Sequence, residues 1–175
     1  MAERSFLYYG EIDSPVGPVT IISSNDGLCR IDFGTMRDLS STLSIWKNRH
    51  FLCGKFIRDE SKVEEETRQL TEYFSGDRER FTVNLDLYGT PFQQKVWKAL
   101  YENVPYGYTN SYKDIAGHIK APQAVRAVGG AINKNPISIV IPCHRVIGSN
   151  GSLVGYNGGL EKKKYLLRLE KAVLD

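Results

Sequence analysis

The chain has 175 residues, of which 41% are hydrophobic and 25% are charged, and its formal net charge is +3. This composition is typical of a folded globular protein and excludes a disordered chain, and no apolar run approaches the ~20 residues that a membrane span requires. Because the N-terminus is polar and no apolar signal segment follows it, we expect a cytoplasmic protein without a membrane partner, or a nuclear one in a eukaryote.

The first half of the chain predicts a small antiparallel sheet. Short runs of alternating or β-branched residues are separated by turn signals such as Asn25-Asp26-Gly27. The expected strands cover residues 6–9, 19–23, 28–33 and 81–87.

One helix is expected beside this sheet, over residues 61–75, because its apolar residues fall on one face. Ser61 would be its N-cap, and Glu64, three residues later, would complete a capping box. Residues 34–58 are ambiguous, although residues 39–46 have a helical pattern.

The pattern changes at Tyr88-Gly89-Thr90-Pro91, where we place the boundary between an N-terminal domain, residues 1–88, and a C-terminal domain, residues 89–175. Thr90 is expected to cap a helix that has Pro91 in its first position, where the missing N–H costs nothing.

Two short helices joined by a tight turn follow, which is the helix-turn-helix layout. Ser111 is expected to cap the first helix, and the second covers residues 124–132. The second helix has small side chains and a single long charged one, Arg126. This pattern fits a helix that closely approaches DNA and fits equally well a tightly packed core helix with one exposed arginine. Basic residues are concentrated in residues 113–145, which favours a nucleic-acid partner.

An apolar run at residues 139–141 predicts a buried strand that ends at Pro142. Cys143, His144 and Arg145 follow directly. A cysteine is a strong nucleophile once it is a thiolate, and a nearby base or positive charge makes it one. We therefore expect Cys143 to be reactive. Glu170, among the apolar positions of the last helix, is a candidate partner for His144.

The other two cysteines, Cys29 and Cys53, stand among apolar residues and are expected to be small buried side chains. A disulfide between them remains an alternative. Together with His50 they provide fewer than the four ligands of a structural zinc site, so we expect no metal.

A series of short motifs runs in order from Thr90 to Glu170. They are Thr90-Pro91-Phe92-Gln93-Gln94-Lys95-Val96-Trp97, Pro105-Tyr106-Gly107, Ser111-Tyr112, Arg126-Ala127-Val128-Gly129-Gly130-Ala131, Asn135-Pro136, Pro142-Cys143-His144-Arg145-Val146, Gly155-Tyr156-Asn157-Gly158-Gly159-Leu160, Leu166-Leu167 and Glu170. In these motifs the chain resembles the O6-alkylguanine-DNA alkyltransferases (methylated-DNA–protein-cysteine methyltransferases). Residues 1–88 resemble that family only in layout.

The resemblance implies an α/β protein of two domains. The first would contain a ribonuclease-H-like antiparallel sheet with a helix, and the second would be mostly helical with a winged-type helix-turn-helix. It also implies a DNA-repair protein that moves alkyl groups from O6 of guanine, and from O4 of thymine, to its own cysteine in a single irreversible turnover. The expected partner is double-stranded DNA, bound through its minor groove with the damaged base flipped out; no cofactor is expected, and the protein would act as a monomer.

The resemblance also assigns roles to residues of this chain. Cys143 would accept the alkyl group, His144 would act as its base through a bridging water, and Glu170 would orient His144. Tyr112 would give a proton to the departing guanine, and Asn135 would support the active-site loop. Arg126 would fill the space left by the flipped base. The remaining DNA contacts would come from Tyr112, Ser111, Ala124, Ala127 and Gly129, and the substrate pocket from Tyr156, Asn157, Gly158 and Val146.

Two alternatives remain beside this function. A lesion-binding relative that transfers nothing would lack the cysteine, which this chain has. A thiol hydrolase with a Cys-His pair would need an oxyanion hole and would leave the helix that carries Arg126 unexplained.

Overall fold

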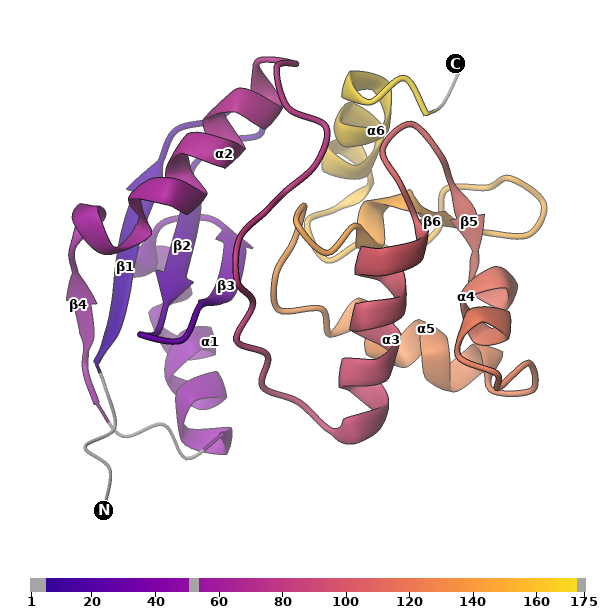
Figure 1. Cartoon of the computed structure of the whole chain (residues 1–175), viewed down its shortest axis with the longest axis horizontal. Coiled ribbons are helices and arrows are strands. Elements are labelled where there is room, and N and C mark those ends of the chain that lie inside the picture. Colours follow the sequence, from indigo (N-terminus) through magenta and orange to yellow (C-terminus); the bar gives the residue numbers. More distant parts are fainter. Residues whose placement is uncertain (1–5, 51–53, 173–175) are drawn as a thin grey trace. The chain divides into compact units, whose positions relative to one another are not determined.

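The computed structural model describes residues 6–50 and 54–172, and the chain divides into two compact units, Met1–Tyr88 and Gly89–Asp175 (Figure 1). Cys53 lies outside the described residues, and so does the alternative of a disulfide between Cys29 and Cys53. Among the helices that can be described, none has the length and apolarity to span a bilayer.

The first unit is built on a four-stranded sheet in the order β3-β2-β1-β4. Strands β1 (Leu7–Ile12), β2 (Val19–Ser23) and β3 (Leu28–Phe33) pair antiparallel, as expected. Strand β4 (Phe56–Arg58) pairs parallel with β1, so the prediction of a purely antiparallel sheet was wrong. The parallel strand comes from the segment whose sequence pattern was ambiguous, and it returns to the sheet after a helix, as a parallel connection requires.

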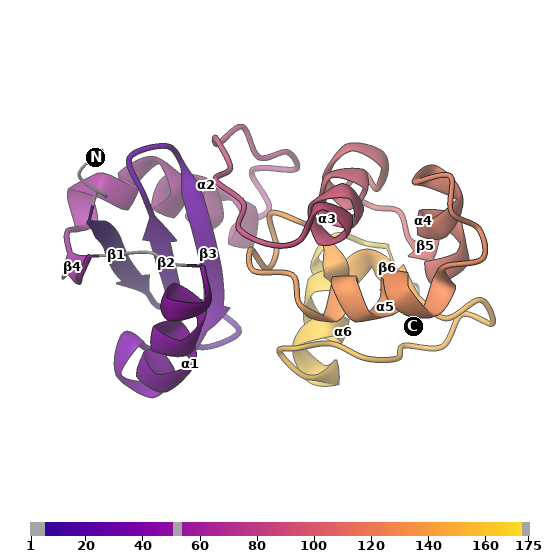
Figure 2. The same cartoon turned by 90° about the horizontal axis from the view of Figure 1, so that it is seen from below.

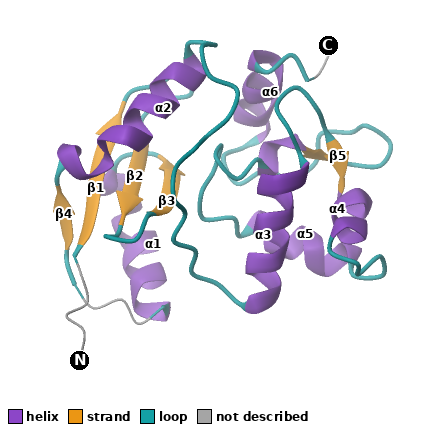
Figure 3. Ribbon diagram, viewed as in Figure 1, coloured by secondary structure: helices purple, strands orange, loops and turns teal. Residues whose placement is uncertain are grey.

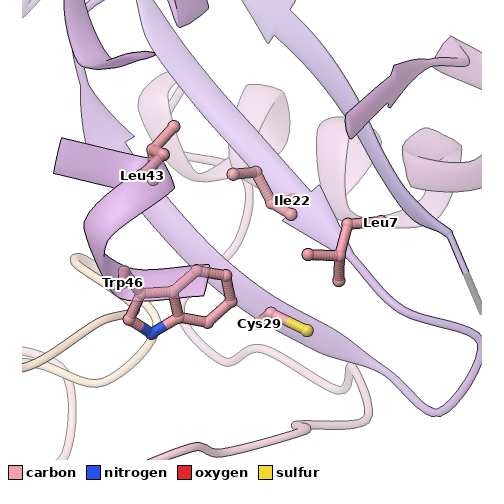
Figure 4. Close-up of a cluster of buried hydrophobic side chains, with 5 residues drawn as sticks. All are labelled: Leu7, Ile22, Cys29, Leu43 and Trp46. Carbon is pink, nitrogen blue, oxygen red and sulfur yellow. The ribbon is translucent and has the colours of Figure 1, made fainter. Parts of the chain in front are cut away.

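Two helices cover opposite faces of this sheet, α1 (Met36–Arg49) on one side and α2 (Glu64–Phe74) on the other (Figures 1 and 2). Every residue of β2 is buried, because a central strand with a helix on each face has no solvent-exposed side. On the α1 side, Leu43 and Trp46 pack against three residues of the sheet, as Figure 4 shows. These are Leu7, Ile22 and Cys29.

Two local predictions in this unit were wrong. Asp59, not Ser61, is the cap: its carboxylate accepts a hydrogen bond from the Ser61 N–H at 3.1 Å and opens a 3-10 turn, η1 (Glu60–Val63), before α2 begins. The expected strand at residues 81–87 is an extended segment with a single bridge, between Leu28 and Leu85. Phe81 at its start is buried, but the segment does not form a continuous ladder.

The second unit is mostly helical (Figure 3). It contains α3 (Pro91–Asn103), α4 (Tyr112–His118), α5 (Val125–Asn133) and α6 (Leu160–Leu169), with a short parallel pair of strands, β5 (Asn110–Ser111) and β6 (Val146–Ile147). Thr90 and Ser111 cap α3 and α4 through full capping boxes, which confirms both predicted helix starts. The Trp97 indole N–H donates to the Ala131 carbonyl at 2.8 Å and fixes α3 against α5.

The apolar run at residues 139–141 is buried, but it forms turns and not the predicted strand. The Val140 N–H donates to the Ser138 carbonyl across Ile139, whose φ of 75° lies in the left-handed region that β-branched residues avoid. The chain then passes Pro142 into a 3-10 turn, η2 (Cys143–Arg145). Hydrophobicity correctly indicated burial here, but it could not distinguish a strand from buried turns.

Candidate active site

Cys143 lies at the start of η2 on the wall of a cavity of about 430 Å³. Only 5% of the residue is exposed, so a reagent reaches the sulfur through this cavity. The wall is formed by the start of α4, the second half of α5, the residue Asn135 after it and the loop before α6; its other residues are Tyr112, Gly129, Gly130, Ile132, Asn133, Asn135, Gly155, Tyr156 and Asn157.

Asn135 holds the turn that carries the cysteine. It is buried, its side-chain amide N–H donates to the Ile141 carbonyl at 2.8 Å, and its side-chain oxygen accepts from the Ile137 N–H at 3.0 Å. These two bonds satisfy backbone groups that the tight turn at Ile139 leaves without a regular partner. The side chain therefore fixes the path of the chain into Cys143.

The surroundings of Cys143 favour a neutral thiol in the free protein. Burial raises its pKa to about 11, and hydrogen bonding to Asn135 and the positive charge of Lys163 offset only part of that effect. A thiol with this pKa is almost entirely protonated at pH 7. A reaction of Cys143 as a nucleophile therefore needs a base.

His144 is bound to Glu170 inside the protein. The His144 Nε2 lies 2.6 Å from the Glu170 Oε2, and neither side chain is exposed. Arg145 holds the same carboxylate from the other side, with Nε 2.7 Å from Oε1, and it also donates to the Val104 carbonyl at 2.7 Å. Although burial opposes ionisation of Glu170, His144 and Arg145 outweigh it and lower its pKa to about 2.

This arrangement determines which nitrogen of His144 can act as a base. Burial lowers the pKa of His144, more than Glu170 raises it, so the ring is neutral at pH 7. An ionised carboxylate only accepts hydrogen bonds, so the single ring proton must lie on Nε2. The lone pair is then on Nδ1, and this atom is buried without a hydrogen-bond partner among the described residues. His144 is thus prepared to take up a proton at Nδ1.

Tyr112 stands across the same cavity, and its hydroxyl donates to the Val154 carbonyl at 3.3 Å. Burial and the nearby Cys143 raise the pKa of its phenol. The hydroxyl therefore remains protonated at pH 7 and keeps a proton available at the cavity wall.

The residues expected to contact DNA divide into three groups. Tyr112 and Gly129 line the cavity, whereas Arg126 and Ala127 are exposed on α5. The other two lie at helix starts. Ala124 occupies the N-cap position of α5, and the Ser111 hydroxyl is used to cap α4.

The predicted pocket residues are divided in a similar way. Tyr156 and Asn157 line the cavity. Gly158 and Val146 are not part of the described cavity wall; Val146 is fully buried, and its carbonyl accepts a hydrogen bond from Lys163. Arg145 is also buried, and its side chain binds Glu170 and the Val104 carbonyl inside the protein.

Sequence reasoning named Arg145 as a charged neighbour of Cys143 but did not predict its burial or its ion pair with Glu170, and it missed Lys163. Lys163 gave no signal, because a lysine between two others near the start of a helix is normally solvated. In the described part of the chain, no group of three metal-ligating side chains converges on one point.

Both units match known protein families. Residues 91–172 match the family described as 6-O-methylguanine DNA methyltransferase, DNA binding domain, and residues 7–87 match the ribonuclease-like domain of the same enzyme. These matches and the observed architecture confirm the α/β fold of two domains that we expected.

Comparison with individual proteins agrees with these family matches. A methylated-DNA–protein-cysteine methyltransferase of Methanosarcina barkeri is 47% identical over 165 residues, which cover 94% of this chain and 98% of the relative. The crystal structure of the Mycobacterium tuberculosis O6-methylguanine methyltransferase superposes with a TM-score of 0.80 at 43% identity and covers 95% of this chain and 93% of its own. A structure of the Mycobacterium tuberculosis OGT protein in complex with DNA gives 0.79 at 42% identity, covering 94% and 92%.

Proposed function

The chain belongs to the 6-O-methylguanine DNA methyltransferase family, and from that premise we propose that it repairs DNA by moving the methyl group of O6-methylguanine to the sulfur of Cys143. The observation that carries this assignment is the cavity with Cys143 on its wall and the buried His144–Glu170 pair behind it. A thioether is stable in water, so each molecule would act once. We extend the proposal to methyl groups on O4 of thymine, which present the same methyl ether.

His144 is the base in this proposal. As substrate enters, the thiol proton of Cys143 passes to Nδ1 of His144 through a bridging water, and the imidazolium that forms is stabilised by Glu170. The thiolate then attacks the methyl carbon: the C–S bond forms as the C–O bond breaks, and the electron pair leaves with the guanine. Since Cys143 is neutral beforehand, the thiolate is made only when it is used.

Tyr112 supplies the proton that the departing guanine needs. Its hydroxyl lies on the cavity wall and would turn from the Val154 carbonyl towards the base. The phenol regains its proton from solvent. Asn135 contributes by holding the turn that carries the sulfur in place.

The substrate base has to leave the duplex, because a sulfur within a cavity cannot reach a stacked base; unstacking costs a few kcal/mol. Helix α5 has the side chains that would contact DNA in this step. Its exposed small residues permit close approach to a minor groove, and Arg126 is long enough to enter the space that the base vacates.

A substitution at Arg126 tests base flipping. Arg126→Ala should slow repair of O6-methylguanine in duplex DNA by about tenfold, because the vacated space is left unfilled. Reaction with free O6-benzylguanine, which needs no flipping, should stay unchanged. Both rates can be measured by mass spectrometry of Cys143; equal slowing would remove this role from Arg126.

The proposed function itself is tested by stoichiometry. Duplex DNA with one O6-methylguanine should add one methyl mass to the peptide that contains Cys143, with no more than one equivalent per protein. Repeated turnover would point to a thiol hydrolase, and binding without any added mass would point to a lesion-binding protein.

Two further properties follow from the proposal. One chain carries every residue of the reaction, so we infer that a monomer suffices. A protein that repairs chromosomal DNA works where that DNA is, in the cytoplasm of a prokaryote or the nucleus of a eukaryote.

A further inference from the structure

Lys120 is an exposed lysine in the turn between α4 and α5 (Figure 1), and its backbone is left-handed, with a φ of 58°. The Lys120 N–H donates to the Gly117 carbonyl at 3.0 Å, and the Ala121 N–H donates to the Ala116 carbonyl at 2.9 Å. These two bonds close the end of α4 in a common way, but glycine usually occupies this position, because a Cβ is strained there. The turn is therefore well defined, and it carries a lysine at a conformational cost.

This turn continues directly into α5. The Ala124 N–H donates to the Ala121 carbonyl at 2.9 Å, and the Val128 N–H donates to the Ala124 carbonyl at 2.8 Å. Hydrogen bonds thus connect the end of α4 with the first turn of α5, and no irregular linker separates the two helices. The backbone of Lys120 therefore has a fixed place before the helix that carries Arg126.

Acidic residues are absent from the sequence around this turn. Residues 115–160 contain no aspartate and no glutamate, although the whole chain has 20 of them. Asp114, the last acidic residue before this stretch, accepts a hydrogen bond from the Ser111 N–H at 2.8 Å as part of the α4 cap. Among the residues that the structure describes, neither Lys120 nor Arg126 forms an ion pair. Their positive charges are therefore available to an anionic partner.

A DNA phosphate fits the position of Lys120. An α-helix is about 10 Å across, whereas the minor groove is about 6 Å wide. When α5 approaches the groove, as the proposed function requires, the segments beside the helix therefore meet the phosphates that border the groove. Lys120 is the cationic residue of the turn that leads into α5. Its ammonium group is a point charge on a flexible stem, which can bind a phosphate oxygen from several directions.

Lys171 provides an internal comparison. It is an exposed lysine with a φ of 57°, and it ends α6 as Lys120 ends α4: the Lys171 N–H donates to the Arg168 carbonyl at 3.0 Å, and the Ala172 N–H donates to the Leu167 carbonyl at 2.9 Å. The two lysines therefore have the same backbone and the same cost. They differ in place, because Lys120 precedes α5 and Lys171 follows a helix that the proposed DNA contacts do not include.

We propose that Lys120 binds a phosphate of the DNA backbone, and that the closing turn of α4 holds it beside the surface that α5 presents to the minor groove. This inference rests on the DNA binding that the proposed function requires. The contact contributes affinity and no chemistry, and it is the same on any sequence, because a phosphate carries no sequence information. Binding to DNA without a methylated base therefore tests it.

Three variants separate the charge of Lys120 from its backbone. Lys120→Gly removes the charge and suits the left-handed conformation, so a loss of binding cannot be attributed to a damaged turn. Lys120→Arg keeps the charge. Lys171→Gly is the matched control, because it makes the same change of residue and charge at the same backbone position of another helix. Both glycine variants should melt no lower than the wild type, since they relieve the same strain.

Fluorescence anisotropy of a labelled, unmethylated duplex measures the binding constant of each variant over a range of salt concentrations. Lys120→Gly should bind about fivefold to tenfold more weakly than the wild type at about 0.1 M salt, and the slope of log binding constant against log salt should fall by about 0.9, the share of one phosphate contact. Lys120→Arg should retain the affinity and the slope of the wild type, and so should Lys171→Gly.

Equal affinities and equal salt slopes in Lys120→Gly and Lys171→Gly would overturn the proposal. Weaker binding of Lys120→Gly with an unchanged slope would overturn it too, because the shape of the turn and not its charge would then matter. Every measurement uses unmethylated DNA, so the result does not depend on methyl transfer. A wild-type protein that binds this duplex but accepts no methyl group from O6-methylguanine would refute the proposed function alone.

Discussion

Among the described residues, each unit has one buried cysteine, and the two have different surroundings. Cys29, on β3, is 1% exposed and packs in the core between the sheet and α1 (Figure 4). Burial and the negative charge of Asp86, whose Oδ2 lies 3.7 Å from its sulfur, raise the pKa of Cys29 to about 12. Cys143 is almost as buried, but it faces a cavity, and its neighbours Asn135 and Lys163 favour the thiolate.

This comparison shows that burial does not decide whether a cysteine is reactive. Burial raises the pKa of both thiols. The difference lies in what else surrounds the sulfur: a carboxylate and apolar side chains at Cys29, and an amide, a cation and a cavity at Cys143.

Removing each sulfur in turn should give the largest difference between the two cysteines. Cys143→Ala should abolish methyl transfer and retain binding to methylated DNA, because the cysteine supplies chemistry and little of the fold. Cys29→Ala should transfer at the wild-type rate and lose about 1 kcal/mol of unfolding free energy, as a small deletion in a core does. Intact mass, fluorescence anisotropy with labelled DNA and chemical denaturation measure the three properties.

Two opposite results would contradict this assignment. Loss of DNA binding in Cys143→Ala would show that this cysteine has a structural role. Loss of methyl transfer in Cys29→Ala would show that the first unit is also needed for the reaction.

Removing the carboxylate behind His144 should leave Cys143 without an effective base. Glu170→Gln should slow transfer by about a hundredfold or more, because the amide can donate to Nε2 and so favours the ring tautomer that lacks a lone pair on Nδ1. Glu161→Gln is the control, since the Glu161 side chain is 93% exposed on the same helix. Single-turnover kinetics measure both; equal rates in the two variants would exclude the role of Glu170.

The smallest expected difference between the two cysteines is in their response to pH. A raised pKa means that a thiol deprotonates only as pH increases, so labelling of both cysteines by iodoacetamide should rise about tenfold per unit from pH 7 to 9 without a plateau. Cys143 should stay ahead of Cys29, since its pKa of about 11 lies below that of Cys29, at about 12, and its sulfur faces a cavity. Peptide mass spectrometry measures each site; a plateau for Cys143 below pH 9 would indicate a thiolate in the free protein.

Local sequence signals predicted much of the fold because they act over a few residues. Thr90 with Pro91, and Ser111 with Asp114, define helix starts by chemistry that needs no distant partner. The β-branched run of β2 and the alternation over β3 likewise depend on neighbours along the chain. The parallel pairing of β4 depends on a crossover and could not be predicted from its own three residues.

The site was predictable to a different extent. Cys143, His144 and Glu170 stood out because polar groups interrupt an apolar pattern. Arg145 stood beside them, but its burial could not be predicted, and Lys163 gave no signal, because nothing in a sequence distinguishes a buried cation from a solvated one. Only packed carbonyls and a carboxylate supplied from elsewhere in the chain make the burial tolerable.

Ile139 has a consequence for attempts to engineer the protein for higher stability. Its left-handed backbone costs about 1–2 kcal/mol, which a glycine would recover. The buried isoleucine side chain contributes about 2–5 kcal/mol to the free energy of unfolding. Replacing Ile139 with glycine would therefore lower the stability of the protein. The turn before the nucleophile is therefore held by the packing of its side chain against the preference of its own backbone, and stabilising substitutions are better sought in the first unit, away from this turn.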